Sequence, residues 1–163
     1  MTSSVIKIDP KLDLVLEREI DVPVELVWKA WTTPEHLRQW FAPKPWIITS
    51  CDIDLRPGGA INFTMRSPEG QEYPNTQSYL DVTPFERLIM TDALLGGYRP
   101  SANPFFTAVL ELARNGNGTR YKAIAIHGND ETRKKHEEMG FHEGWGTVVT
   151  QMVEYIKAGR MQS

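Results

Sequence analysis

The sequence predicts an α+β fold in which one curved antiparallel sheet of about six to seven strands wraps around a long C-terminal helix. The helix is indicated by large apolar residues spaced at i, i+4, i+7, i+8, i+11 and i+15, which form one stripe on a 3.6-residue helix. These residues are Phe141, Trp145, Val148, Val149, Met152 and Ile156. The sheet is indicated by alternating apolar and polar segments between residues 51 and 127 that are joined by tight turns, a pattern typical of antiparallel pairing. A single sheet needs a cover on its apolar face, and the C-terminal helix is expected to supply it.

The N-terminal part predicts one strand followed by two short helices. Alternation over residues 12–20 predicts a strand with leucines on one face. Pro23 then stands where a short amphipathic helix can start. Thr33 and Pro34 predict a second helix, with the threonine as its cap and the proline at the first helical position. Residues 42–46 hold two prolines and predict a loop.

The middle of the chain predicts hairpins. Turn residues at 56–59 separate alternating segments at 51–55 and 61–65. The strands expected after them lie at residues 72–82, 87–92, 105–113 and 120–127, with a long loop at 94–104. The Asn-Gly-Asn-Gly sequence at 115–118 is the strongest hairpin signal in the chain. Asp130 is then expected to cap a charged helical turn that leads into the C-terminal helix.

Length and charge set the limits on function. The 163 residues suit one domain, expected at 12–158, with an N-terminal extension at 1–11 and a C-terminal tail at 159–163. A net charge of −3 with acids and bases mixed gives no basic field, so no nucleic-acid partner is expected. The first residues lack the apolar core of a signal peptide, and the C-terminal stripe is interrupted by charges, so a cytoplasmic protein without membrane insertion is expected. The single cysteine, Cys51, has no disulfide partner in the chain and is expected to be buried, with a reactive thiol as the alternative.

Four ordered segments carry a resemblance to a known family. They are Glu19 to Leu37, Asp54 to Gly59, Pro84 to Leu88 and Gly140 to Gly146. Together they resemble the homologue family of the activator of heat-shock-protein-90 ATPase, within the START-like, polyketide-cyclase-like (SRPBCC) superfamily. The resemblance implies the helix-grip fold over roughly residues 12–158. That superfamily includes lipid carriers, hormone receptors, cyclases and co-chaperones, so the resemblance is more specific for fold than for activity.

The resemblance also implies a hydrophobic cavity between the C-terminal helix and the sheet, which would bind a small hydrophobic or amphipathic ligand such as a lipid. Candidate lining residues are Phe141, Trp145, Val149 and Met152 on the helix, Trp40, Phe41 and Trp46 at the mouth, and Phe63, Met65, Met90 and Phe106 on the sheet. The alternative is that these side chains simply fill a core.

Polar candidates lie on the segment at 120–127. Tyr121 and His127 share one face with two alanines, which leave room beside the histidine. If that face is concave, His127 is a candidate general base or a hydrogen-bond donor to a ligand, and Asp92 at the matching end of another strand would orient it. The alternative is a partly solvated histidine at a strand end. The sequence shows no phosphate loop, nucleophile elbow or convincing carboxylate pair, so a cyclase-like or hydrolase-like enzyme stays an alternative to a binding protein, and no cofactor is expected.

Metal ions and protein partners are the remaining possibilities. His136 and His142 are six residues apart, whereas a zinc-protease helix needs an interval of four, so no metal is expected and both histidines are interpreted as solvated. The eukaryotic activators carry a further chaperone-binding domain that residues 1–11 cannot replace, so a chaperone partner is not favoured. A stress-response partner and a homodimer through the loops at 41–46 or 94–106 stay open.

Overall fold

The computed structural model describes residues 6–159 and 161 of the chain. Residues 1–5 of the expected N-terminal extension, and residues 160, 162 and 163 of the expected C-terminal tail, lie outside the described residues.

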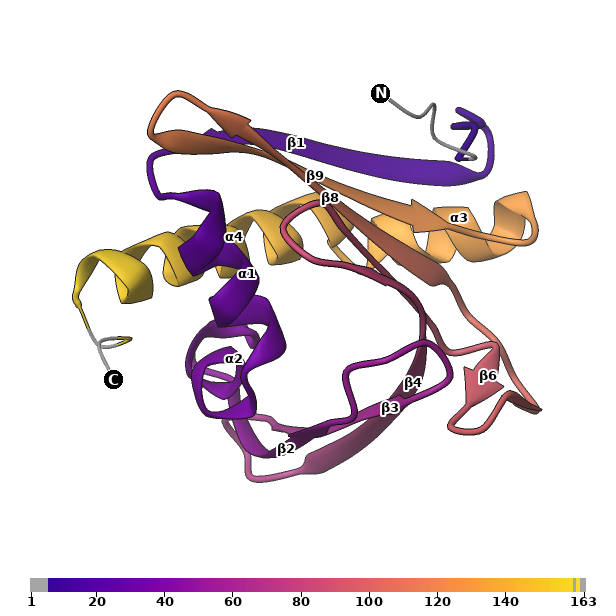
Figure 1. Ribbon diagram of the computed structural model, residues 1–163. Helices are drawn as coiled ribbons and strands as arrows, with labels where there is room; N and C mark the ends of the chain where they lie inside the picture. Colours follow the sequence, from indigo (N-terminus) through magenta and orange to yellow (C-terminus); the bar gives the residue numbers. More distant parts are fainter. Residues whose placement is uncertain (1–5, 160, 162–163) are drawn as a thin grey trace.

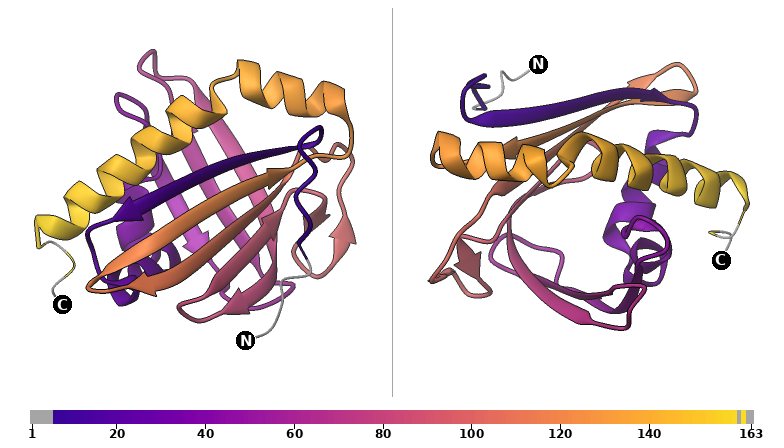
Figure 2. Two further views of the ribbon diagram at one scale, coloured as in Figure 1. Left: turned by 90° about the horizontal axis from the view of Figure 1, so that it is seen from above. Right: turned by 180° about the vertical axis from the view of Figure 1, so that it is seen from behind.

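A seven-stranded antiparallel sheet forms the body of the protein (Figures 1 and 2). Its strands are β1 (Asp13–Ile20), β2 (Ile47–Ile53), β3 (Ala60–Arg66), β4 (Glu72–Thr83), β5 (Arg87–Thr91), β8 (Thr107–Asn115) and β9 (Gly118–Ile126). Their order across the sheet is β1-β9-β8-β5-β4-β3-β2, so the first strand pairs with the last along its whole length. The predicted antiparallel sheet is confirmed.

The tight turns lie where the sequence indicates them. β8 and β9 are joined by a hairpin in which Asn115 pairs with Gly118, and Gly116 has the positive φ of 61° that such a turn requires. The expected loop at 94–104 differs in one respect. It contains a small two-stranded sheet of β6 (Leu94–Leu95) and β7 (Arg99–Pro100), because the chain reverses through Gly97 at a φ of 77°.

Two short helices follow β1, as predicted: α1 (Val24–Thr32) and α2 (Pro34–Trp40). Pro34 occupies the first turn of α2, but the Thr33 side chain makes no capping hydrogen bond. The cap expected at Asp130 is also wrong. Asn129 caps α3 (Asp130–Glu138) by accepting a hydrogen bond from the Thr132 N–H at 2.8 Å, which leaves Asp130 as the first helical residue.

The C-terminal helix, α4 (Phe141–Lys157), is separate from α3. Gly140 lies between them with a φ of 92°, a left-handed conformation that favours glycine, so α4 begins at Phe141. No helix in the described ranges is both long and apolar enough to cross a membrane.

The predicted stripe of α4 faces the core. α4 lies across the concave face of the sheet, and α1 and α2 fill the space between α4 and the end of the sheet that holds β2 (Figure 1). The buried side chains of α4 are Phe141, Val148, Val149, Met152, Tyr155 and Ile156. Burying each large apolar side chain contributes roughly 1.5–3 kcal/mol, so this stripe is a main source of the stability that holds α4 on the sheet.

Candidate functional site

An open pocket lies at the N-terminal end of α4, with a volume of about 270 Å³. Its walls come from α4, the end of α3, the segment after α2, strands β3 and β4, and the segment before β8. It is lined by Phe41, Pro43, Phe63, Met65, Asn75, Gln77, Phe106, His136, Met139, Gly140, Phe141, Gly144, Trp145 and Val148. The lining is mainly apolar, with three polar side chains: Asn75, Gln77 and His136.

The structure brings together only part of the predicted ligand-binding set. The candidates that line this pocket are Phe41, Phe63, Met65, Phe106, Phe141 and Trp145. The candidates buried in the core away from it are Trp40, Met90, Tyr121, Val149 and Met152, each no more than 3% exposed. Trp46 borders a different depression beside α2 and packs against the ring of Tyr73 at a centroid distance of 5.6 Å.

Gly144 explains why the pocket is open. A Cβ atom placed on Gly144, which lies in the wall of the pocket, would meet no atom within 4 Å beyond its own turn of the helix. A Cβ atom on Gly146 would instead lie 3.3 Å from Nη2 of Arg18. Glycine costs a helix roughly 1 kcal/mol relative to alanine, so the empty space at Gly144 is kept at some cost to the stability of α4.

Trp145 forms an anchored part of the wall. Its indole Nε1 donates a hydrogen bond to the hydroxyl of Tyr121 at 3.0 Å, and its ring packs against Phe141 at 5.5 Å. Tyr121 is fully buried, and burial raises the pKa of its hydroxyl well above the usual range. Tyr121 therefore stays protonated and supports the pocket from behind.

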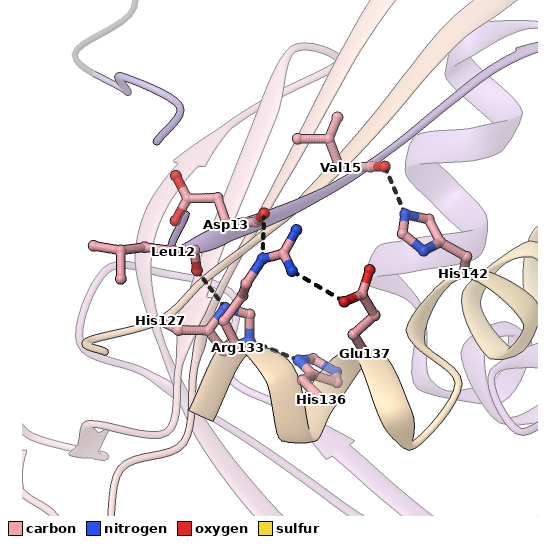
Figure 3. A network of polar contacts seen from close by, with 8 residues as sticks. All are labelled: Leu12, Asp13, Val15, His127, Arg133, His136, Glu137 and His142. Atoms are coloured by element: carbon pink, nitrogen blue, oxygen red, sulfur yellow. Dashed lines mark hydrogen bonds and ion pairs between the residues drawn. The ribbon is translucent and has the colours of Figure 1, made fainter. Parts of the chain in front are cut away.

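His127 is buried rather than partly solvated, with 4% of its surface exposed. Its Nδ1 lies 2.7 Å from the carbonyl oxygen of Leu12, and its Nε2 lies 2.9 Å from Nδ1 of His136 (Figure 3). Both ring nitrogens are thus engaged, and His127 does not line the apolar pocket. The side chain that reaches the pocket is its partner, His136.

The interpretation of His136 as a solvated residue is wrong. Its ring packs against Phe106 at 4.7 Å, Phe105 at 5.0 Å and Phe141 at 5.3 Å. Burial, followed by repulsion from His127, lowers the pKa of His136 from 6.5 to about 4. By contrast, His142 is exposed and lies with its Nε2 3.2 Å from the carbonyl oxygen of Val15 (Figure 3).

No local signal in the sequence marks His136 as a site residue. None of the side chains of α3 is buried, and the helix has the charged composition of a solvated one. The partial burial of His136 is created by residues 105 and 106, which are far away in the sequence.

Asp92 does not orient His127 as expected. Its Oδ1 accepts hydrogen bonds from the backbone N–H groups of Phe105 at 2.8 Å and Phe106 at 3.1 Å. Both nitrogens of His127 already have other partners. Asp92 instead fixes the segment whose two rings pack against His136.

Asp92 and His127 line another depression with Thr91 and Thr132, and a metal site and a reactive thiol are the remaining possibilities. Among the described residues, no group of three or more His, Cys, Asp and Glu side chains is placed to hold a metal ion. Cys51 is half-buried rather than buried, and burial raises the pKa of its thiol to about 11, which disfavours the reactive thiolate.

Comparisons with known proteins agree with this architecture. Residues 21–157 match the family model described as "Activator of Hsp90 ATPase homolog 1-like protein". A crystal structure of a protein from Nitrosomonas europaea is 52% identical, with a TM-score of 0.91 over 94% of this chain and 99% of that one. At 19% identity, an AHSA1-like protein from Aeromonas hydrophila shares the fold, with a TM-score of 0.70 over 91% of this chain and 94% of that one. No curated protein matches the chain.

Proposed function

Because this chain belongs to the family of activator of Hsp90 ATPase homolog 1-like proteins, we propose that it acts as a START-like binding protein for a small hydrophobic or amphipathic molecule. The proposed site is the pocket in front of Gly144. The observation that carries the proposal is an apolar hollow whose wall on α4 lacks a side chain at Gly144, where a Cβ atom would meet nothing beyond its own turn of helix. A helix glycine that neither packs closely nor turns the chain is well explained by space reserved for a ligand.

The size of the pocket limits the ligand. Pockets for drug-sized ligands measure about 300–1,000 Å³, and this one, at about 270 Å³, lies just below that range. It therefore suits a molecule of one or two rings or a short acyl chain. A ligand that buries about 150 Å² of apolar surface would gain about 4 kcal/mol at ~25 cal/mol per Å², before the entropy cost of association.

The polar lining residues would orient such a ligand. Asn75 donates from Nδ2 to the carbonyl oxygen of Tyr73 at 2.9 Å, so its side-chain position is fixed. Gln77 lies two residues further along β4, and His136 belongs to a different wall. An amphipathic molecule would place its polar group near one of these three and its apolar body against Phe63, Phe141 and Trp145.

The test compares two glycines of the same helix. A leucine at Gly144 would fill the pocket, whereas a leucine at Gly146 would project toward the flexible end of Arg18. The probe is 2-methylnaphthalene, a purely apolar two-ring molecule, followed by the backbone amide resonances of residues 141–148. We expect saturable binding by the wild type, similar binding by Gly146→Leu, and at least a tenfold loss in Gly144→Leu, which corresponds to about 1.4 kcal/mol.

Equal affinities in all three proteins, or no saturable binding by the wild type, would contradict the proposal. Urea unfolding of both variants checks that each one is folded. Native mass spectrometry of the protein purified from its own host, followed by organic extraction, would identify the natural ligand.

A further inference from the structure

The two histidines beside the pocket form a chain of hydrogen bonds with a defined direction. The carbonyl oxygen of Leu12 can only accept, so Nδ1 of His127 must carry the proton in that bond. In neutral His127 the other nitrogen, Nε2, then has a lone pair and accepts from Nδ1–H of His136. Neutral His136 is left with a lone pair on its own Nε2.

This last nitrogen is available to a ligand. His136 lines the apolar pocket, and its Nε2 has no hydrogen-bond partner among the described residues. The fully buried polar side-chain atoms that lack a partner in the described residues do not include this nitrogen. Nε2 of His136 is therefore accessible. Nδ1 and Nε2 lie on different sides of an imidazole ring, so a ring whose Nδ1 faces His127 directs Nε2 elsewhere (Figure 3). Beside the amides of Asn75 and Gln77, the lining of the pocket thus includes a histidine with an unpaired acceptor nitrogen packed among aromatic rings.

The charged side chains nearby do not change this chemistry. Arg133, one turn before His136 on α3, bonds through Nη1 to Oε1 of Glu137 at 3.0 Å and through Nε to the carbonyl oxygen of Asp13 at 3.4 Å. Its charge is thus directed toward β1 and along α3. Of the rings that pack against His136, those of Phe105, Phe106 and Phe141 carry no charge, and the fourth is that of its hydrogen-bond partner His127.

We propose that the ligand of the pocket is an apolar molecule bearing a hydroxyl group, such as a phenol or an alicyclic alcohol, and that this hydroxyl donates a hydrogen bond to Nε2 of His136. The inference rests on the proposed function and specifies the chemical class of its ligand. A carboxylate is disfavoured at the same position while His136 is neutral, because its oxygen atoms would face the lone pair of Nε2 without a proton between them. His136 contacts the ligand, and His127 acts as a positioning residue that fixes the tautomer of His136.

The experiment compares 2-naphthol with 2-methylnaphthalene, in which a methyl group replaces the hydroxyl at nearly equal size. The ratio of their dissociation constants is measured in the wild type, His136→Asn and the control His142→Asn. In His136→Asn the amide lies near the position of Nδ1 and can still donate to His127, but the acceptor at Nε2 is lost. We expect the preference for the hydroxyl to fall about tenfold in His136→Asn and to be unchanged in His142→Asn. The carboxylate analogue, 2-naphthoate, is expected to bind the wild type more weakly than 2-naphthol does.

A second readout uses the wild type alone and so does not depend on the folding of a variant. The nitrogen-15 resonance of His136 Nε2 is expected to shift when 2-naphthol binds and to stay in place when 2-methylnaphthalene binds. The same ratio in the wild type and in His136→Asn, or no shift of that resonance with bound 2-naphthol, would overturn the inference while leaving an apolar binding site intact. Failure of both probes to bind would overturn the proposed function as well.

Discussion

The indole nitrogen of Trp145 lies 3.0 Å from the hydroxyl oxygen of Tyr121, and this hydrogen bond joins the wall of the pocket on α4 to the middle of β9. The ring of Trp145 is only partly buried, whereas Tyr121 is completely buried. The bond therefore lets Tyr121, which is in the core, hold Trp145, which faces the pocket. A pocket wall held in this way keeps its shape when no ligand is present. This favours binding, because less conformational entropy is lost when the ligand binds.

Tyr121→Phe removes the acceptor of this bond and leaves the indole N–H of Trp145 without its partner. We expect the free energy of unfolding to fall by about 1–2 kcal/mol. The indole N–H of Trp145 would be shielded from water without a hydrogen bond to replace the one it makes with water. Urea unfolding followed by tryptophan fluorescence measures the change.

Tyr79→Phe is the matched control. Tyr79 is equally buried, but its hydroxyl has no hydrogen-bond partner in the described part of the chain. We expect this variant to keep the wild-type free energy of unfolding or to exceed it by up to about 1 kcal/mol, since no bond is lost. Equal losses in the two variants would show that the bond between Trp145 and Tyr121 contributes nothing specific.

Asp92→Ala should loosen the segment that covers His136. The carboxylate accepts hydrogen bonds from two consecutive N–H groups, those of Phe105 and Phe106, and its loss should lower the free energy of unfolding by about 1–3 kcal/mol. Amide hydrogen exchange at these two residues should accelerate more than elsewhere. Asp54→Ala is the control, because Asp54 is exposed and its carboxylate pairs with the exposed Arg56; a change below about 0.5 kcal/mol is expected there. Unchanged exchange at residues 105 and 106 would contradict this role of Asp92.

The architecture was predictable because it depends on periodicity. The stripe from Phe141 to Ile156 specifies which side of α4 is buried, and alternation with Asn-Gly turns specifies strands and their order in hairpins. These signals are repeated over many residues, so an error at one position does not change the fold. Cap positions depend on a single side chain: Thr33 is the N-cap residue as predicted but makes no side-chain capping bond, and the cap predicted at Asp130 lies at Asn129 instead.

The pocket was predictable only in part because its boundary depends on packing between distant elements. Trp40 and Phe41 are adjacent aromatic residues, yet Trp40 is 1% exposed in the core and Phe41 borders the pocket. Nothing in the local sequence separates them. His136 shows the same limit more strongly, because its helix has the composition of a solvated one and its burial comes from phenylalanines about 30 residues earlier.

The half-buried position of His136 predicts a pH dependence of stability with a definite sign. Its pKa is about 4 in the folded protein, below the ordinary value of 6.5, so the unfolded chain takes up the proton first as the pH falls. Stability from this group is therefore complete above about pH 7 and is lost as the pH falls from about 6.5 to 4. The full shift would correspond to about 3 kcal/mol, and discounting it for the partial exposure of the ring leaves about 1–2 kcal/mol.

The measurement is urea unfolding between pH 7.5 and about 4.5 in the wild type, His136→Asn and His142→Asn. We expect the wild type and His142→Asn to lose more stability over this range than His136→Asn does, by the amount assigned to His136. Other groups titrate as well, including His36, whose pKa is lowered by burial, but they are common to the three proteins and cancel in the difference. His127 is the titratable group in direct contact with His136, so the difference between the curves reports on the pair of histidines. Parallel curves for all three proteins would mean that His136 is protonated as easily in the folded chain as in the unfolded one. In that case the rings of Phe105, Phe106 and Phe141 would not disfavour the protonated form of His136.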